Sequence, residues 1–204
     1  MSDFKLKIPK ALIYCRLMLG ILMVLFSFLH INHYIFIAIT LFSTGLLTDI
    51  FDGIIARHLN ISTQHLRRLD STIDQFFFVL VVIATFIQSP HFFYNNSTEL
   101  LILLSFEAAT YILCFIKFRK EIATHAISSK IWTLILFATL IQIMATNNST
   151  ILFQICFYIG VITRLEIIGI ILTIRKWTND IPSLYHAILL RQGKKIKRHK
   201  LFNG

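Results

Sequence analysis

The chain has little charge, because only 15% of its 204 residues are Asp, Glu, Lys or Arg, against about 25% in an average soluble domain. It also has few cysteines. Cys15, Cys114 and Cys156 lie far apart in apolar segments and form neither a disulfide framework nor a metal or redox motif. No internal repeat or low-complexity tract is visible. These absences exclude a disordered chain, a soluble single-core domain and a secreted disulfide scaffold.

Apolar residues make up 56% of the chain, with nineteen phenylalanines and a mean hydropathy of +0.71. They gather in six segments, at about 11–29, 34–56, 70–88, 99–117, 131–146 and 151–174. Lipid offers no partner for free backbone N–H or C=O groups, and these segments are too long for barrel strands. The sequence therefore predicts an all-α integral membrane protein with six transmembrane helices. The first segment exceeds a signal-peptide core in length, so we expect it to stay as the first span.

The basic residues are distributed on alternate connections between these segments. The connections near 30–33, 89–98 and 147–150 contain no Lys or Arg, whereas nineteen of the twenty basic residues lie at the termini and the other connections. By the positive-inside rule, both termini are predicted to be cytoplasmic. Membrane orientation also accounts for the net charge of +10, so no nucleic-acid partner is expected.

Two regions are predicted along the chain, a six-span domain over 1–178 and a short, basic cytoplasmic tail over 179–204. In the tail, Ser183 is a candidate cap for a short amphipathic helix. The basic cluster at 194–200 is compatible with attraction to anionic headgroups and equally with ordinary orientation charge.

Four aspartates lie at the predicted cytoplasmic ends of the second and third spans. Asp49 and Asp52 are three residues apart, and Asp70 and Asp74 are four apart, so each pair shares one face of a helix. Two adjacent helices can therefore present four carboxylates to a common space. Gly53 and Ala56 fall on the same broad face as the first pair and leave room for a ligand.

Clustered carboxylates repel one another, and hard divalent cations relieve that repulsion. Oxygen ligands favour Mg²⁺, Mn²⁺ or Ca²⁺ over zinc, and a pair of such ions suits phosphoryl chemistry. Arg57, one turn after Gly53, could bind phosphate oxygens. The alternative interpretation is an ion-paired helix end, in which Arg57, Arg67 and Arg68 neutralise the aspartates.

The segment from Asp49 to Asp74 reads DIFDGIIARHLNISTQHLRRLDSTID. It resembles the signature of the CDP-alcohol phosphatidyltransferases, D-x2-D-G-x2-A-R-x8-G-x3-D-x3-D. Seven of the eight fixed positions match in identity and spacing, namely Asp49, Asp52, Gly53, Ala56, Arg57, Asp70 and Asp74. The segment from Pro9 to Arg16 is similar, more weakly, to the entry segment of that family. The eighth position, a glycine near the nucleotide in the family, is Leu66 here, which could narrow the cytidine pocket or shift the loop.

The resemblance implies an enzyme that transfers a phosphatidyl group from CDP-diacylglycerol to a small alcohol and releases CMP. It implies that Asp49, Asp52 and Asp70 bind Mg²⁺ or Mn²⁺, and that Asp74 bridges the ions or acts as general base. By the same resemblance, nucleotide and phosphate are bound by Asp49, Gly53, Ala56 and Arg57. The expected location is a bacterial inner membrane with the active site facing the cytoplasm. The resemblance also allows a homodimer, although no interface is legible in the sequence.

The sequence defines the alcohol acceptor less well than the CDP-diacylglycerol donor. Ser129 to Thr133 weakly resembles a stretch of the phosphatidylglycerophosphate synthases, which makes glycerol 3-phosphate the preferred acceptor. Inositol phosphate, serine and choline are the alternatives. Phe106 stands where those enzymes carry an arginine, so the acceptor phosphate needs other cations. The candidates are Lys117, Arg119, Lys130 and Arg164.

Glu107 and Arg164 are charges deep inside the fourth and sixth spans. Intramembrane charges are expensive and mostly functional, or else they pair with each other. Two interpretations remain open, an interhelical Glu107–Arg164 pair and an acceptor site built by both residues. A transporter is disfavoured because the motif acids cluster at one face, and a non-catalytic lipid or nucleotide binder remains an alternative because of Leu66.

Overall fold

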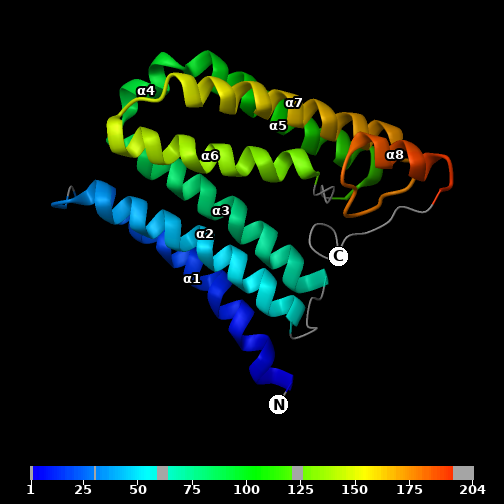
Figure 1. Cartoon of the computed structure of the whole chain (residues 1–204), viewed down its shortest axis with the longest axis horizontal. Coiled ribbons are helices and arrows are strands. Elements are labelled where there is room, and N and C mark those ends of the chain that lie inside the picture. Colours follow the sequence, from blue (N-terminus) through cyan, green and yellow to red (C-terminus); the bar gives the residue numbers. More distant parts are fainter. Residues whose placement is uncertain (1, 30, 59–63, 121–125, 195–204) are drawn as a thin grey trace. The chain divides into compact units, whose positions relative to one another are not determined.

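The computed structural model describes residues 2–29, 31–58, 64–120 and 126–194, without the side chains of residues 2–8, 56–58, 64, 65 and 67. The regular elements of this part are all helices (Figure 1). Their bounds are α1 Ser2–Phe28, α2 Tyr34–His58, α3 Gln64–Gln88, α4 Pro90–Asn95, α5 Ser97–Phe118, α6 Ile127–Thr146, α7 Ile151–Thr173 and α8 Leu184–Arg191.

Six of these helices contain segments long and apolar enough to cross a membrane. The segments are Pro9–Phe28, Tyr34–Ile55, Arg68–Gln88, Ser97–Phe118, Ile127–Thr146 and Ile151–Thr173. The all-α fold and the six predicted spans are therefore confirmed, and the chain is an integral membrane protein. The short helix α4, which begins at Pro90 in the connection after α3, was not predicted.

The chain forms two compact units. The first comprises Met1–Phe92 and Leu140–Asn148, and the second comprises Phe93–Thr139 and Ser149–Gly204. The boundaries between the units fall within α4, within α6 and in the connection between α6 and α7. All four signature aspartates lie in the first unit, and the Glu107–Arg164 pair lies in the second.

In the first unit, α1 packs against both α2 and α3, and Phe77 of α3 contacts α2. Phe77 of α3 is 2% exposed and lies against Phe42 of α2. A Cβ atom added to Gly45 would be 2.2 Å from the Phe77 ring, and one added to Gly20 would be 3.0 Å from it. These glycines therefore allow α1 and α2 to approach Phe77 closely.

This contact determines where the aspartates meet. Asp49 follows Gly45 by four residues on α2, and Asp74 precedes Phe77 by three residues on α3. Each aspartate is thus about one helical turn from the contact of Gly45 with Phe77. The two pairs of carboxylates are brought together by apolar packing that lies next to them in each helix.

In the second unit, Trp132 of α6 fills the space left by a glycine of α7. A Cβ atom on Gly160 would be 2.6 Å from the indole Nε1 atom of Trp132. The indole N–H donates to the carbonyl oxygen of Cys156 at 3.0 Å. The Arg164 guanidinium lies over the Trp132 ring, with its Cζ atom 4.3 Å from the ring centroid. The deep arginine is therefore held by cation–π contact as well as by charge.

The C-terminal segment packs onto the end of α7. Ile181 and Ala187 are fully buried in an apolar cluster with Ile170 and Ile171. The predicted short helix is present as α8, but the predicted cap is not, since Ser183 makes no hydrogen bond to the backbone of α8 from its N-cap position. Its hydroxyl contacts His186 Nδ1 at 2.9 Å instead.

A carboxylate from α7 takes the capping role at α8. Glu166 Oε1 accepts the Leu184 N–H at 3.2 Å, and Glu166 Oε2 accepts the Ser128 hydroxyl at 2.5 Å. A negative charge at a helix N-terminus is favourable because the free N–H groups there carry partial positive charge. Glu166 therefore joins α6, α7 and α8 of the second unit.

Candidate active site

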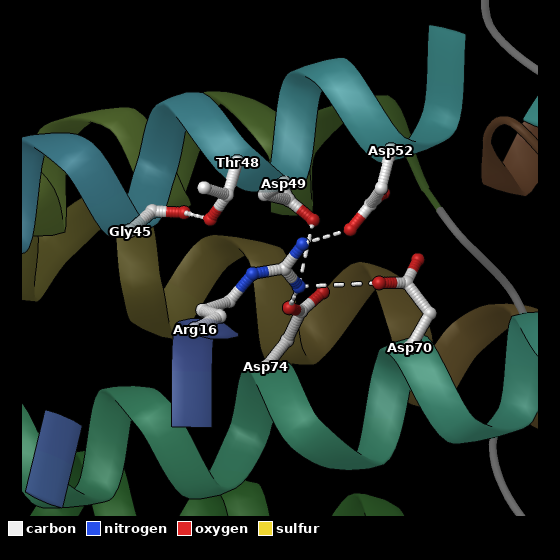
Figure 2. A network of polar contacts seen from close by, with 7 residues as sticks. All are labelled: Arg16, Gly45, Thr48, Asp49, Asp52, Asp70 and Asp74. Atoms are coloured by element: carbon white, nitrogen blue, oxygen red, sulfur yellow. Dashed lines mark hydrogen bonds and ion pairs between the residues drawn. The ribbon is translucent and has the colours of Figure 1, made fainter. Parts of the chain in front are cut away.

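The signature aspartates surround one arginine of the first helix. Figure 2 shows the Arg16 guanidinium, from α1, between Asp49 and Asp52 of α2 and Asp70 and Asp74 of α3. Its Nη1 atom is 3.1 Å from Asp49 Oδ1 and 3.1 Å from Asp70 Oδ1, and it also contacts Asp74 Oδ1. Its Nη2 atom pairs with Asp52 Oδ2. Three helices therefore converge on a single cation.

The cluster has a closed side and an open side. The side chains of Arg16 and Asp52 are 1% and 3% exposed, whereas those of Asp49, Asp70 and Asp74 are between 31% and 38% exposed. Thr48 lies beside the cluster, but its hydroxyl donates to the Gly45 carbonyl oxygen at 2.7 Å. A ligand can therefore reach the cluster from the side of Asp49, Asp70 and Asp74.

The three exposed carboxylates form a candidate metal site. One oxygen each from Asp49, Asp70 and Asp74 lies within 4.8 Å of the other two. All donors are carboxylate oxygens, which suit Mg²⁺ or Mn²⁺ and not a thiolate-seeking metal. The predicted ligand Asp52 lies outside this group of three and pairs with Arg16. The donor set fits a hard divalent ion.

The other signature residues are less fully described. Gly53 follows Asp52 in α2 and is half-buried. The side chains of Ala56, Arg57 and Arg67 lie outside the described residues. Arg68 is described and exposed. Among the described side chains, Arg16 is the cation that pairs with all four aspartates.

Leu66 lies in the apolar packing at the same end of the unit. Its side chain is 4% exposed and clusters with Ile13 of α1 and Ile73 of α3. At this position the family pattern has a glycine. The leucine side chain therefore contributes to the contact between α1 and α3, the two helices that carry Arg16 and Asp70.

The four candidate acceptor ligands lie in the second unit. Lys117 Nζ donates to the carbonyl oxygens of Ile171 and Leu172 at 2.9 and 2.8 Å, near the end of α7. Arg119 lies over the Phe115 ring, with Cζ 5.7 Å from the centroid. Lys130 is exposed in the first turns of α6.

Arg164 is 8% exposed and pairs through Nε with Glu107 Oε2. The interhelical pair is therefore present in the structure. This pairing satisfies both deep charges within the second unit.

Arg16 is the residue that sequence reasoning missed. It was grouped with the basic residues that orient the N-terminus, although it lies well inside the span Pro9–Phe28. A charge at that depth is costly unless it meets a partner or a function. Its position after the start of the apolar run was the signal that could have separated it from Lys5, Lys7 and Lys10.

Comparison with known proteins agrees with the signature. The comparisons with curated proteins and with solved structures returned no match. The family model for CDP-alcohol phosphatidyltransferase matches residues 6–173, which include all six spans and the four aspartates. The chain is therefore a member of the CDP-alcohol phosphatidyltransferase family, a transferase of phospholipid biosynthesis.

Proposed function

We propose that this enzyme transfers the phosphatidyl group of CDP-diacylglycerol to glycerol 3-phosphate. The products are phosphatidylglycerophosphate and CMP. The observation that carries the proposal is the convergence of Asp49, Asp70 and Asp74 within 4.8 Å inside the family signature. Family membership supports the donor class and a divalent metal. The acceptor rests on the weaker likeness of Ser129 to Thr133 to the glycerophosphate-specific enzymes.

In the proposed reaction, the acceptor hydroxyl oxygen bonds to the lipid-linked phosphorus of the donor. The bond from that phosphorus to the bridging oxygen breaks, and CMP leaves with the electron pair. Asp74 takes the hydroxyl proton as general base. Asp49, Asp52, Asp70 and Asp74 would hold Mg²⁺ or Mn²⁺, which would neutralise charge on the diphosphate. Asp49, Gly53, Ala56 and Arg57 would bind the nucleotide and its phosphates.

The acceptor phosphate needs cationic side chains that a soluble anion can reach. Arg164 is paired with Glu107, and the Lys117 ammonium is bonded to two carbonyl groups. Arg119 and Lys130 are exposed, which favours them as ligands of a soluble anion. We therefore propose Arg119 and Lys130 as primary phosphate ligands, with Lys117 and Arg164 as weaker candidates.

The test is CMP release by the purified protein in lipid nanodiscs. CDP-diacylglycerol and Mg²⁺ or Mn²⁺ are supplied with one acceptor at a time: glycerol 3-phosphate, inositol phosphate, serine or choline. We expect release with glycerol 3-phosphate, with phosphatidylglycerophosphate identified by mass spectrometry, and no release after chelation of the metal.

Two other results are informative. Release with a different acceptor would overturn the glycerol 3-phosphate assignment while keeping the chemistry. Release that persists in chelator would overturn the metal site. Replacement of Lys130 by Gln should raise KM for glycerol 3-phosphate and leave KM for CDP-diacylglycerol unchanged. Replacement of Lys120, whose ammonium lies 4.6 Å from the Trp177 ring centroid, is the matched control for loss of one positive charge.

A further inference from the structure

Glu166 connects two helices through its carboxylate. It lies inside the span Ile151–Thr173, where a charged side chain is costly and is mostly kept for a function. Its Oε1 atom accepts a hydrogen bond from the N–H of Leu184, the first residue of α8, at 3.2 Å. Its Oε2 atom accepts one from the hydroxyl of Ser128, in the first turn of α6, at 2.5 Å. The carboxylate therefore bridges the beginning of α8 and the beginning of α6.

The backbone makes a second connection between the same two places. The Ile127 N–H, at the start of α6, donates to the Pro182 carbonyl oxygen at 3.0 Å. The first N–H groups of a helix have no acceptor within that helix, so this bond gives α6 an external one. Ala126 and Ile181 are both fully buried and belong to one apolar cluster. The segment 181–184 thus holds the beginning of α6 through its backbone, through Glu166 and through apolar packing.

The first turn of α6 also carries Lys130, one of the two primary phosphate ligands of the proposed function. Lys130 is exposed and lies two residues after Ser128. Residues of one helical turn share a fixed geometry, so contacts that hold Ile127 and Ser128 also hold the backbone of Lys130. A ligand that is already in place binds an anion without the entropic cost of being ordered first. The position of this lysine therefore depends on the C-terminal segment.

We propose that Glu166, Pro182 and Leu184 form a C-terminal clamp that positions Lys130 for the phosphate of the alcohol acceptor. Glu166 is a positioning residue in this clamp, since it acts on the acceptor through Ser128 and the first turn of α6. The proposal rests on the proposed function, in which Lys130 binds the acceptor phosphate. It adds that acceptor binding depends on residues 181–184, which follow the part of the chain that the family model matches, 6–173.

The test removes one bond of the clamp at a time and measures KM for each substrate in nanodiscs. Leu184→Pro removes the N–H that donates to Glu166. Proline is tolerated in the first turn of a helix, and Ser183 already has the extended backbone that a following proline requires, with φ −161° and ψ 168°. Leu184→Ala is the matched control, because it also loses the leucine side chain and keeps the N–H.

Relative to Leu184→Ala, Leu184→Pro should raise KM for glycerol 3-phosphate about three- to tenfold, the equivalent of one lost hydrogen bond. KM for CDP-diacylglycerol should stay unchanged, because the signature aspartates lie in the other compact unit. Ser128→Ala should have the same selective effect, and Ser128→Thr, which keeps a hydroxyl, should retain the wild-type KM. The effects of Ser128→Ala and Leu184→Pro should not add, since both act through one carboxylate.

Hydrogen–deuterium exchange detects the clamp without turnover. In Glu166→Gln the side chain keeps its size, but its amide nitrogen cannot accept, so one of its two bonds is lost. The amides of Ile127 and Ser129, which are hydrogen-bonded in wild type, should then exchange faster. Peptides from α2 are the internal control and should exchange at the wild-type rate. Together with KM of the same variant, this measurement decides the question if Leu184→Pro does not fold.

The outcomes separate the clamp from the proposed function. Equal KM for glycerol 3-phosphate in Leu184→Pro and Leu184→Ala would overturn the clamp and leave the reaction intact. Equal increases in KM for both substrates, or unchanged exchange in Glu166→Gln, would also contradict it. Turnover by wild type with a different acceptor would overturn the glycerol 3-phosphate assignment alone, and the same KM comparison with that acceptor then decides the clamp. No turnover by wild type with any acceptor would overturn the proposed function, and the acceptor role of the clamp with it.

Discussion

Asp74 lies one helical turn further into the third span than Asp70, and its carboxylate faces both Arg16 and the open side of the cluster. This position permits two roles, a bridging metal ligand and a general base. Replacement by Asn keeps the size of the side chain and removes its ability to take a proton. We expect turnover of Asp74→Asn to fall by about 10²–10⁴-fold, the usual contribution of a positioned base.

Mn²⁺ binding, measured on the same sample, distinguishes the two possible roles of Asp74. Lost turnover with retained Mn²⁺ binding identifies a base, and loss of both identifies a ligand. Glu99→Gln is the matched control, because Glu99 is a half-buried acid in the first turn of α5. Unchanged turnover of Asp74→Asn would remove this residue from the mechanism.

Variants of Glu107 and Arg164 can decide whether the two residues form a structural ion pair or an acceptor site. Arg164→Gln alone leaves Glu107 without its cation. Because the Glu107 side chain is 37% exposed, the loss of stability should be smaller than about 3–5 kcal/mol, the cost of breaking a fully buried pair. The double variant Glu107→Gln/Arg164→Gln removes both charges and should recover most of the melting temperature. If the pair is structural, the double variant is active with an unchanged KM for glycerol 3-phosphate. If Arg164 binds the acceptor, KM for glycerol 3-phosphate rises in the stable double variant and KM for CDP-diacylglycerol does not.

The aspartates could be predicted from the sequence, because fixed helical spacing determines which residues share a face. The contacts of Arg16 could not be predicted, because the nearest of its partners in sequence, Asp49, is 33 residues away (49 − 16 = 33). Only the packing of α1 against α2 and α3 brings its guanidinium to them. The packing of Leu66 against Ile13 could not be predicted either, because it also depends on the position of α1.

At the scale of the helices, the close approach at Phe77 has a direct test. A methyl group on Gly45 would be 2.2 Å from the Phe77 ring, which is 2% exposed, so the ring or a helix must shift. Gly45→Ala should therefore force α2 and α3 apart, at a cost of about 1–3 kcal/mol for an overpacked core. Because Asp49 and Asp74 flank this contact, Mn²⁺ binding should weaken together with the melting temperature.

A second, compensating substitution distinguishes overpacking at Phe77 from a general loss of stability. Phe77→Leu in the Gly45→Ala background removes ring atoms from the clash and should restore part of both properties. Gly169→Ala is the matched control, since its added Cβ would be 3.2 Å from a terminal methyl of Leu184, which can give way. Full Mn²⁺ binding and stability in Gly45→Ala would show that the contact does not position the aspartates.

The spans could be predicted from the sequence because lipid accepts only long apolar helices. The ends of the helices were harder to predict, since the first turn of a helix can be polar and then lies outside the apolar run. The fifth span was predicted from 131, but α6 begins at Ile127 and includes Ser128, Ser129 and Lys130. Ser129 N–H bonds to the Ala126 carbonyl oxygen there. The cap of α8 was missed for another reason, because Glu166 reaches it from a different helix.

At the scale of the whole molecule, the charge distribution predicts which ends of the spans face the cytoplasm. Apart from Arg16 and Arg164, which lie inside spans, the basic residues are at the termini, at span ends and on alternate connections, and the signature aspartates lie at the same ends of their spans. Moving basic loops across a membrane is disfavoured, so both termini and the aspartates should be cytoplasmic. In the proposed reaction, the cytoplasm also supplies the water-soluble acceptor and receives CMP.

Reporter fusions in a bacterial inner membrane test this orientation. Green fluorescent protein fused after Gly204 should fluoresce, since it matures only in the cytoplasm, and alkaline phosphatase at the same site should be inactive. Fusions after Asn148, in a connection without Lys or Arg, are the matched control and should give the opposite pattern. Active phosphatase after Gly204 would place the aspartates on the outer side. Donor and acceptor would then have to meet outside the cytoplasm, where a soluble phosphorylated acceptor is not retained, and the proposed reaction would lose its physical basis.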